Sequence, residues 1–150
     1  VEASCITTDD LSDFIRGIAA KKIALLMDTC HSGSAVRDLG VVAMTRSVEE
    51  RRLVATLAKD QGIAVFSASS ESQAAYEIRE LGHGIFTWCV INALTVHRDE
   101  ITRNGVITIG GLLDYVSKAT RETAFKYLKT DQSPVMYNFG DNFSLGIAGK

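Results

Sequence analysis

Two continuous apolar runs of strand length stand out along this chain. Residues 23–27 read Ile-Ala-Leu-Leu-Met and residues 63–66 read Ile-Ala-Val-Phe, the pattern of strands that are buried on both faces of a parallel sheet. Segments 106–108, 134–137 and 143–147 are shorter or more mixed strand candidates. The pattern therefore predicts a sheet with two central strands and several weaker ones.

Segments with helical spacing of apolar residues lie between these strands. The first predicted helix begins near Thr8, which can cap it, and a second begins at the capping box of Ser47 and Glu50. The apolar run 84–94 is predicted to form a buried helix, and a longer helix over 109–128 follows the potential cap residue Thr108. Each helix follows a strand or precedes one, so strands and helices alternate.

Alternating strands and helices are typical of the α/β class, with a mostly parallel sheet and helices on both faces. The chain has 150 residues, of which 46% are hydrophobic and 23% charged. This length and composition predict one globular domain over residues 1–150.

The overall charge of the chain is nearly balanced. Sixteen basic and 18 acidic residues give a net charge of -2, so neither nucleic acid nor a membrane is expected as a partner. The three cysteines cannot all pair and fit no zinc spacing. We therefore expect a reducing, cytoplasmic location and no metal or cofactor. No signal peptide is evident, and the apolar runs are shorter than the ~20 residues of a membrane span.

Residues 28–33 carry the most specific chemistry of the chain. They read Asp-Thr-Cys-His-Ser-Gly and follow directly after the apolar run 23–27. Cys30 is therefore expected in a turn at the carboxyl end of a strand, where parallel sheets place their functional residues. This segment closely resembles the active-site motif of caspase-like cysteine peptidases, in particular metacaspases and bacterial caspase homologues. Weaker likeness to the same family extends over 63–94 and 132–145.

The resemblance implies a three-layer caspase-like fold, of which residues 1–150 would be the C-terminal portion. It also implies a cysteine endopeptidase that acts on polypeptides, with Cys30 as the nucleophile. The family's general base is a histidine about 50 residues before the cysteine, but no histidine precedes Cys30 here. The base is therefore expected from an N-terminal segment of the same protein outside this chain. Proteolytic processing, for example by the enzyme itself, would account for a chain that begins at Val1.

The resemblance further predicts cleavage after arginine or lysine. Asp28 matches an acid that faces the substrate's P1 side chain in metacaspase-like proteins, and an acid there would repel a P1 aspartate. Ser67, Ser69 and Glu77 lie in a segment that resembles another wall of this pocket, so they are further candidates for substrate contacts. Each has a structural alternative. An acid at a strand end can simply cap a turn, and the segment after residue 66 can be a solvated loop.

None of the three histidines of the chain is favoured as the general base. His31 is adjacent to Cys30 and belongs to the turn, His83 precedes a predicted helix, and His97 lies in a charged stretch. A non-enzymatic caspase-like scaffold or interaction module is the alternative function. A nucleotide-binding domain is disfavoured because no G-x-G-x-x-G loop follows any predicted strand.

Overall fold

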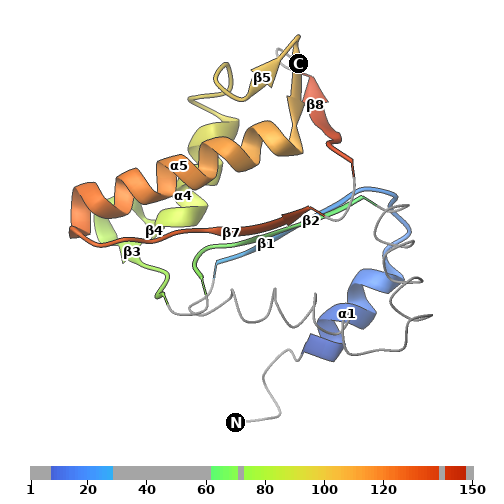
Figure 1. Ribbon diagram of the computed structural model, residues 1–150, viewed down its shortest axis with the longest axis horizontal. Helices are drawn as coiled ribbons and strands as arrows, with labels where there is room; N and C mark the ends of the chain where they lie inside the picture. Colours follow the sequence, from blue (N-terminus) through green and yellow to red (C-terminus); the bar gives the residue numbers. More distant parts are fainter. Residues whose placement is uncertain (1–7, 29–61, 71–72, 139–140, 148–150) are drawn as a thin grey trace.

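The computed structural model describes residues 8–28, 62–70, 73–138 and 141–147 of the chain (Figure 1). Its elements in chain order are α1 (Thr8–Gly17), β1 (Ile23–Met27), β2 (Ile63–Ser67), β3 (Glu77–Ile78), the 3-10 helix η2 (Arg79–Leu81), β4 (His83–Gly84), α4 (Ile85–Leu94), β5 (Thr102–Arg103), β6 (Val106–Thr108), α5 (Ile109–Leu128), β7 (Val135–Asn138) and β8 (Ser144–Ile147). The described part of the chain is thus mixed α/β.

The two continuous apolar runs form neighbouring parallel strands. β1 and β2 pair in register from Ile23 opposite Ile63 to Met27 opposite Ser67, and β7 pairs with the other edge of β2. β2 is the central strand and is almost entirely buried, as its continuous apolar sequence predicts. The prediction of strands over 23–27 and 63–66 is therefore confirmed.

The prediction of a mostly parallel sheet is wrong for the described strands. β1 and β2 are the one parallel pair among them, whereas β7 runs antiparallel to β2. The reason lies in the connection before β7. α5 follows β6, which belongs to a different sheet, and ends near the carboxyl end of β2. The short segment 129–134 then starts β7 at that same end, so β7 must run back along β2. An antiparallel edge strand of this kind is common in α/β sheets.

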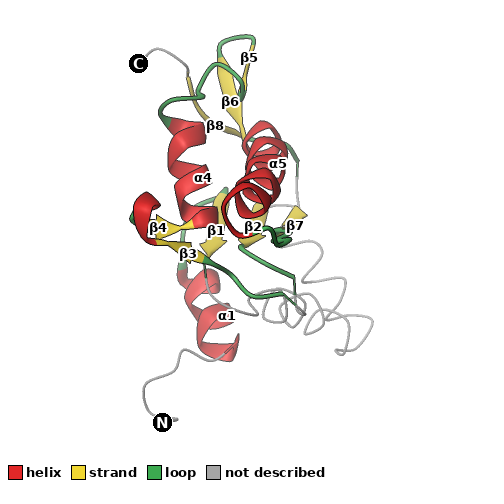
Figure 2. Ribbon diagram, turned by 90° about the vertical axis from the view of Figure 1, so that its left-hand side faces the viewer, coloured by secondary structure: helices red, strands yellow, loops and turns green. Residues whose placement is uncertain are grey.

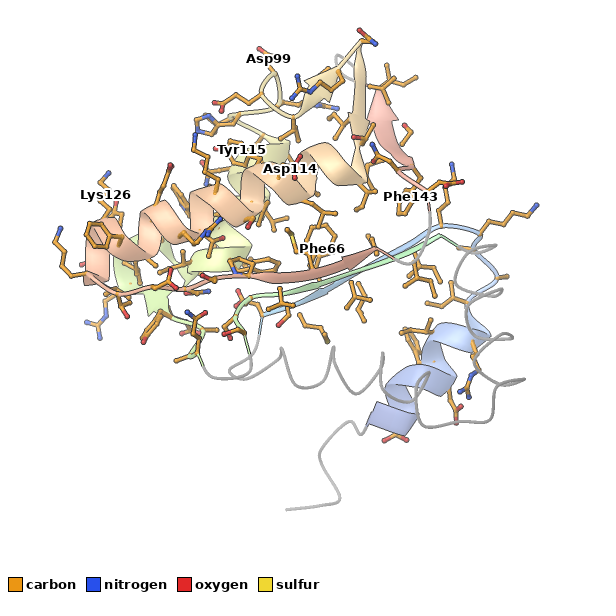
Figure 3. All side chains as sticks on the ribbon, viewed as in Figure 1. Phe66, Asp99, Asp114, Tyr115, Lys126 and Phe143 are labelled. Atoms are coloured by element: carbon orange, nitrogen blue, oxygen red, sulfur yellow. The ribbon has the colours of Figure 1, made fainter. Side chains whose placement is uncertain are left out.

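Helices lie on both sides of this sheet. α4 and α5 pack against each other over one face, and α1 lies on the opposite side (Figures 1 and 2). Phe66 of β2 is fully buried and lies between the sheet and α5 (Figure 3). It joins a single cluster with Phe86 and Cys89 of α4 and Val116 of α5. Burial of this cluster is the main source of stability for these layers.

A second, smaller sheet joins β5, β6 and β8. Asn104 and Gly105 connect β5 to β6, and both have positive φ angles, of 51° and 76°. Two successive left-handed residues define the type I′ turn, which Asn-Gly adopts at low steric cost. The strand expected over 106–108 is confirmed as β6, and that expected over 143–147 is confirmed as β8.

The helices expected near Thr8, over 84–94 and over 109–128 are confirmed as α1, α4 and α5. Thr108 caps α5 as predicted, because its Oγ1 accepts a hydrogen bond from the backbone N–H of Gly111 at 3.2 Å. α4 is buried along one face only, and Ile91 is exposed on the other. The helix expected after Ser47 lies outside the described residues. Within the described part, no helix is both long and apolar enough to cross a membrane.

Candidate functional site

Asp28 follows β1 directly and is half-buried at the carboxyl end of the strand. Its Oδ2 accepts two hydrogen bonds from one residue of α4: the backbone N–H of Thr87 donates at 3.2 Å, and the Thr87 hydroxyl also donates. Thr87 is the third residue of α4, whose own cap residue, Gly84, has no side chain to accept such a bond. Asp28 therefore caps α4 from a separate element, and its charge also favours the positive end of the helix dipole.

The glycine at position 84 makes room for this contact. Its φ of -56° suits any residue, so backbone conformation does not require glycine there. A Cβ at this position would instead lie 3.0 Å from Cγ and 3.1 Å from Oδ1 of Asp28, and closer still to Oδ2. Glycine thus permits the carboxylate of Asp28 to approach the first turn of α4.

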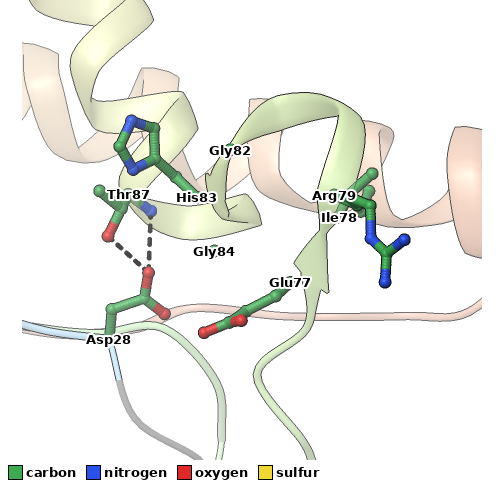
Figure 4. A pocket seen from close by; sticks show the side chains of 8 residues that line it. All are labelled: Asp28, Glu77, Ile78, Arg79, Gly82, His83, Gly84 and Thr87. Carbon is green, nitrogen blue, oxygen red and sulfur yellow. Dashed lines mark hydrogen bonds between the residues drawn. The ribbon is translucent and has the colours of Figure 1, made fainter.

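The Asp28 carboxylate also faces an open pocket of about 830 Å³. The pocket is lined by Asp28, Glu77, Ile78, Arg79, Gly82, His83, Gly84 and Thr87. Figure 4 shows the carboxylates of Asp28 and Glu77 pointing toward one another across it, whereas the Arg79 guanidinium points away from the pair. Neither carboxylate forms an ion pair with another described residue.

This arrangement can bind a cation. Two facing carboxylates without a cationic partner offer acceptors for an ammonium or guanidinium group, and hydrogen bonds between ions are about twice as strong as neutral ones. Oδ2 of Asp28 is occupied by Thr87, so Oδ1 is the oxygen that remains for a ligand. Glu77 is exposed and makes no side-chain hydrogen bond within the described residues. The chemistry of the pocket is therefore that of an open acidic recess with room for a basic side chain.

The structure brings together two of the five candidate site residues, Asp28 and Glu77. Ser67 and Ser69 are fully buried, and neither lines the pocket. The Ser67 hydroxyl donates to the backbone oxygen of Ser69 at 2.9 Å, and the Ser69 hydroxyl has no hydrogen-bond partner in the described part of the chain. Contact between these serines and a substrate stays a prediction. Cys30 lies outside the described residues.

Thr87, His83 and Gly84 line the pocket but were not among the candidate site residues. A helix that begins after glycine lacks a side-chain cap of its own. Gly84 at the start of the predicted helix could therefore have indicated that a side chain from another segment caps it. His83 is exposed, and its ring points away from the two carboxylates in Figure 4. His97 is not a pocket residue. Its Nδ1 lies 2.7 Å from Glu100 Oε1.

Cys89 is the free cysteine of the described part, and it is buried in α4. Burial raises the pKa of the Cys89 thiol, although its hydrogen bond to the Thr123 hydroxyl lowers the pKa in part. A buried thiol with a raised pKa is a poor nucleophile at neutral pH. The chemistry expected of a reactive cysteine therefore cannot be assigned to Cys89.

The described residues contain no group of three or more His, Cys, Asp or Glu side chains that could hold a metal ion. Comparison of the chain with protein-family models, with curated proteins and with solved structures gave no match in any of the three. The function must therefore be inferred from the chemistry of the residues themselves.

Proposed function

We propose that this chain is the C-terminal portion of a caspase-like cysteine endopeptidase that cleaves after arginine or lysine. The observation that carries the proposal is the acidic pocket at the carboxyl end of β1. Asp28 lies in this pocket opposite Glu77, and it stands two residues before Cys30 in the sequence. A nucleophile and a recess for a basic side chain would then be close neighbours.

The parallel pairing of β1 and β2 supports this interpretation of the motif. Parallel strands gather their functional residues at one edge, where their carboxyl ends meet. Asp28 follows β1 at this edge, and the loop after β2 leads from the same edge to Glu77. In the three-layer caspase-like fold that the sequence resembles, this edge carries the catalytic cysteine.

Recognition of the P1 side chain would rest on charge. A charge-assisted hydrogen bond contributes about 1.5–3 kcal/mol when it is shielded from water. Glu77 is exposed, so its contribution would lie below that range and fall as salt is added. Asp28 is half-buried and would contribute the larger share. A P1 aspartate would face two carboxylates and be excluded by repulsion.

The proposed reaction follows the chemistry of thiol peptidases. A histidine from outside this chain takes the proton of the Cys30 thiol, and the thiolate attacks the scissile carbonyl carbon. The backbone N–H of Cys30 and a second donor stabilise the oxyanion. Collapse of the tetrahedral intermediate breaks the peptide C–N bond, and the histidine gives its proton to the leaving amine. Water then hydrolyses the thioester, which releases the acid and restores the thiol.

The test uses the full-length protein and an arginyl peptide chloromethylketone, followed by mass spectrometry of the digested chain. We expect alkylation at Cys30, its loss in Cys30→Ala, and much slower labelling by the aspartyl analogue. Cys89 supplies an internal control, because a buried thiol should stay unmodified until the protein is denatured. Equal labelling by the arginyl and aspartyl reagents would contradict the proposed specificity.

A second candidate function is a catalytically inactive caspase-like scaffold or interaction module. One observation favours it: Asp28 caps α4, so this residue has a structural role that requires no substrate. The same labelling experiment separates the two functions. Absence of Cys30 labelling in the folded full-length protein would support the scaffold and overturn the peptidase.

A further inference from the structure

Gln132 is a fully buried side-chain amide that precedes β7. Its Nε2 donates to the backbone oxygen of Ala68 at 2.9 Å, and its Oε1 accepts from the backbone N–H of Tyr76 at 3.1 Å. Ala68 and Tyr76 stand at the beginning and the end of the loop between β2 and β3. The Gln132 side chain therefore connects both ends of the loop, one through its amide N–H and the other through its amide oxygen.

Tyr76 connects this bridge to the acidic pocket. Its backbone oxygen accepts a hydrogen bond from the N–H of Ile85, the first residue of α4, at 2.9 Å. The next residue, Glu77, begins β3 and is paired with Gly84. Gln132 is thus hydrogen-bonded to Tyr76, the residue that precedes Glu77 and that accepts a hydrogen bond from the first turn of α4. Gln132 itself does not line the pocket.

A second glutamine ties the same loop to the same segment by other contacts. Gln73 donates through Nε2 to Asp131 Oδ2 at 2.8 Å and accepts through Oε1 from the backbone N–H of Ser133 at 2.9 Å. Unlike Gln132, its side chain makes no hydrogen bond to Tyr76 or to α4 among the described residues. Gln73 therefore offers a matched control: the same residue type tethers the same loop but without the link to the pocket.

We propose that Gln132 is a positioning residue for the acidic pocket. By holding the amide of Tyr76, it sets the separation between the Glu77 carboxylate and the first turn of α4, where Asp28 is bound. The assignment of the ligand as a basic side chain rests on the proposed function. The positioning itself does not, because it follows from the hydrogen bonds of Gln132 and Tyr76.

The experiment compares Gln132→Met, Gln132→Glu and Gln73→Met with the unmodified protein. The probe is Nα-acetyl-arginine methylamide, with its uncharged norleucine counterpart as reference, and binding is followed by NMR titration. Amide hydrogen exchange is measured on the same samples at Tyr76 and Ile85, with Val116 of α5 as a reporter of global stability.

Loss of one net hydrogen bond corresponds to about a tenfold change in an equilibrium constant. For Gln132→Met we therefore expect arginine binding to weaken about tenfold and exchange at Tyr76 and Ile85 to quicken by a similar factor. Exchange at Val116 should quicken less. Gln73→Met should leave both the binding and the exchange at Tyr76 close to those of the unmodified protein.

Gln132→Glu makes the two hydrogen bonds of this side chain dependent on pH. A protonated glutamic acid can donate to Ala68 and accept from Tyr76, as the amide does, whereas its carboxylate lacks the donor. Relative to the unmodified protein at the same pH, protection of Tyr76 should be low at about pH 7 and recover as the pH falls toward about 5, because burial at position 132 raises the pKa of a carboxyl group. The same-pH comparison is the control for the other carboxylates of this region, those of Asp28, Glu77 and Asp131.

The outcomes separate this inference from the proposed function. Unchanged exchange at Tyr76 and Ile85 in Gln132→Met would overturn the positioning role, whatever the probe does. Quicker exchange without any arginine binding by the unmodified protein would support the positioning role and contradict the proposed pocket ligand. If Gln132→Met fails to fold, absence of recovery by Gln132→Glu at low pH would overturn the inference.

Discussion

The two roles of Asp28, as helix cap and as pocket carboxylate, can be separated by a pair of substitutions. Asp28→Ala removes the acceptor of both Thr87 hydrogen bonds and the charge. Asp28→Asn removes the charge but keeps an oxygen that can accept from the N–H and the hydroxyl of Thr87. The capping role therefore predicts a clear loss of stability for Asp28→Ala and a smaller loss for Asp28→Asn.

The magnitude follows from the contacts. Loss of a helix cap costs about 1 kcal/mol, and loss of a charge at the helix N-terminus costs about 0.3–1 kcal/mol. The pocket is open, so water can replace part of the lost acceptor at Thr87. We expect Asp28→Ala to lower the free energy of unfolding by about 1–2 kcal/mol, and Asp28→Asn by about 0.3–1 kcal/mol.

Urea unfolding at neutral pH measures both values. The single tryptophan, Trp88, follows Thr87 in α4 and packs against the core, so its fluorescence reports on this helix. Binding of an arginine probe should weaken in both variants, because both lack the charge. Equal destabilisation by the two substitutions would refute the hydrogen-bonded cap, and a loss below about 0.3 kcal/mol for Asp28→Ala would refute capping altogether.

Three further predictions concern the same layers of the molecule. Gly84→Ala should lower the free energy of unfolding by about 1–2 kcal/mol, because its Cβ displaces the Asp28 carboxylate. In a double-mutant cycle, the same substitution should cost much less when Asp28→Ala is already present. Additive costs would contradict the steric explanation. Thr108→Ala should cost about 1 kcal/mol through loss of the α5 cap, as judged by thermal unfolding, and an unchanged midpoint would count against that cap. Burial raises the pKa of Cys89 above the ordinary thiol value of 9.0, so the thiol ionises at a lower pH in the unfolded chain than in the folded protein. The free energy of unfolding should therefore fall as the pH rises past about 9, and it should fall less steeply in Cys89→Ala. Equal slopes in the two proteins would argue against the raised pKa.

Local pattern was sufficient to predict the elements that position the pocket. β1, β2, α4 and α5 each coincide with a predicted segment to within a residue. Their apolar spacing and the Thr108 cap are short-range properties, which the sequence displays directly. The Asn104–Gly105 turn is a signal of the same kind and could also have been read from the sequence.

The resemblance of two segments to a known family predicted that Asp28 and Glu77 line the same pocket. The pattern of apolar and polar residues alone did not indicate that these two residues lie close together. The two residues come from different strands, and the distance between them depends on the parallel register of β1 and β2 and on the path of the loop between β2 and β3. The placement of Cys30 in the molecule stays a prediction, since that residue lies outside the described part.

Other features were decided by tertiary structure alone. Asp28 and Thr87 are 59 positions apart, and periodicity shows which face of each segment is apolar but not which elements meet. The antiparallel direction of β7 depends on where α5 ends, and the burial of Ser67 depends on the helices packed over β2. The sequence by itself thus determined the longer strands, the helices α1, α4 and α5 and one helix cap, because these depend on neighbouring residues. Contacts between distant segments, and with them the acidic pocket, required the packed fold.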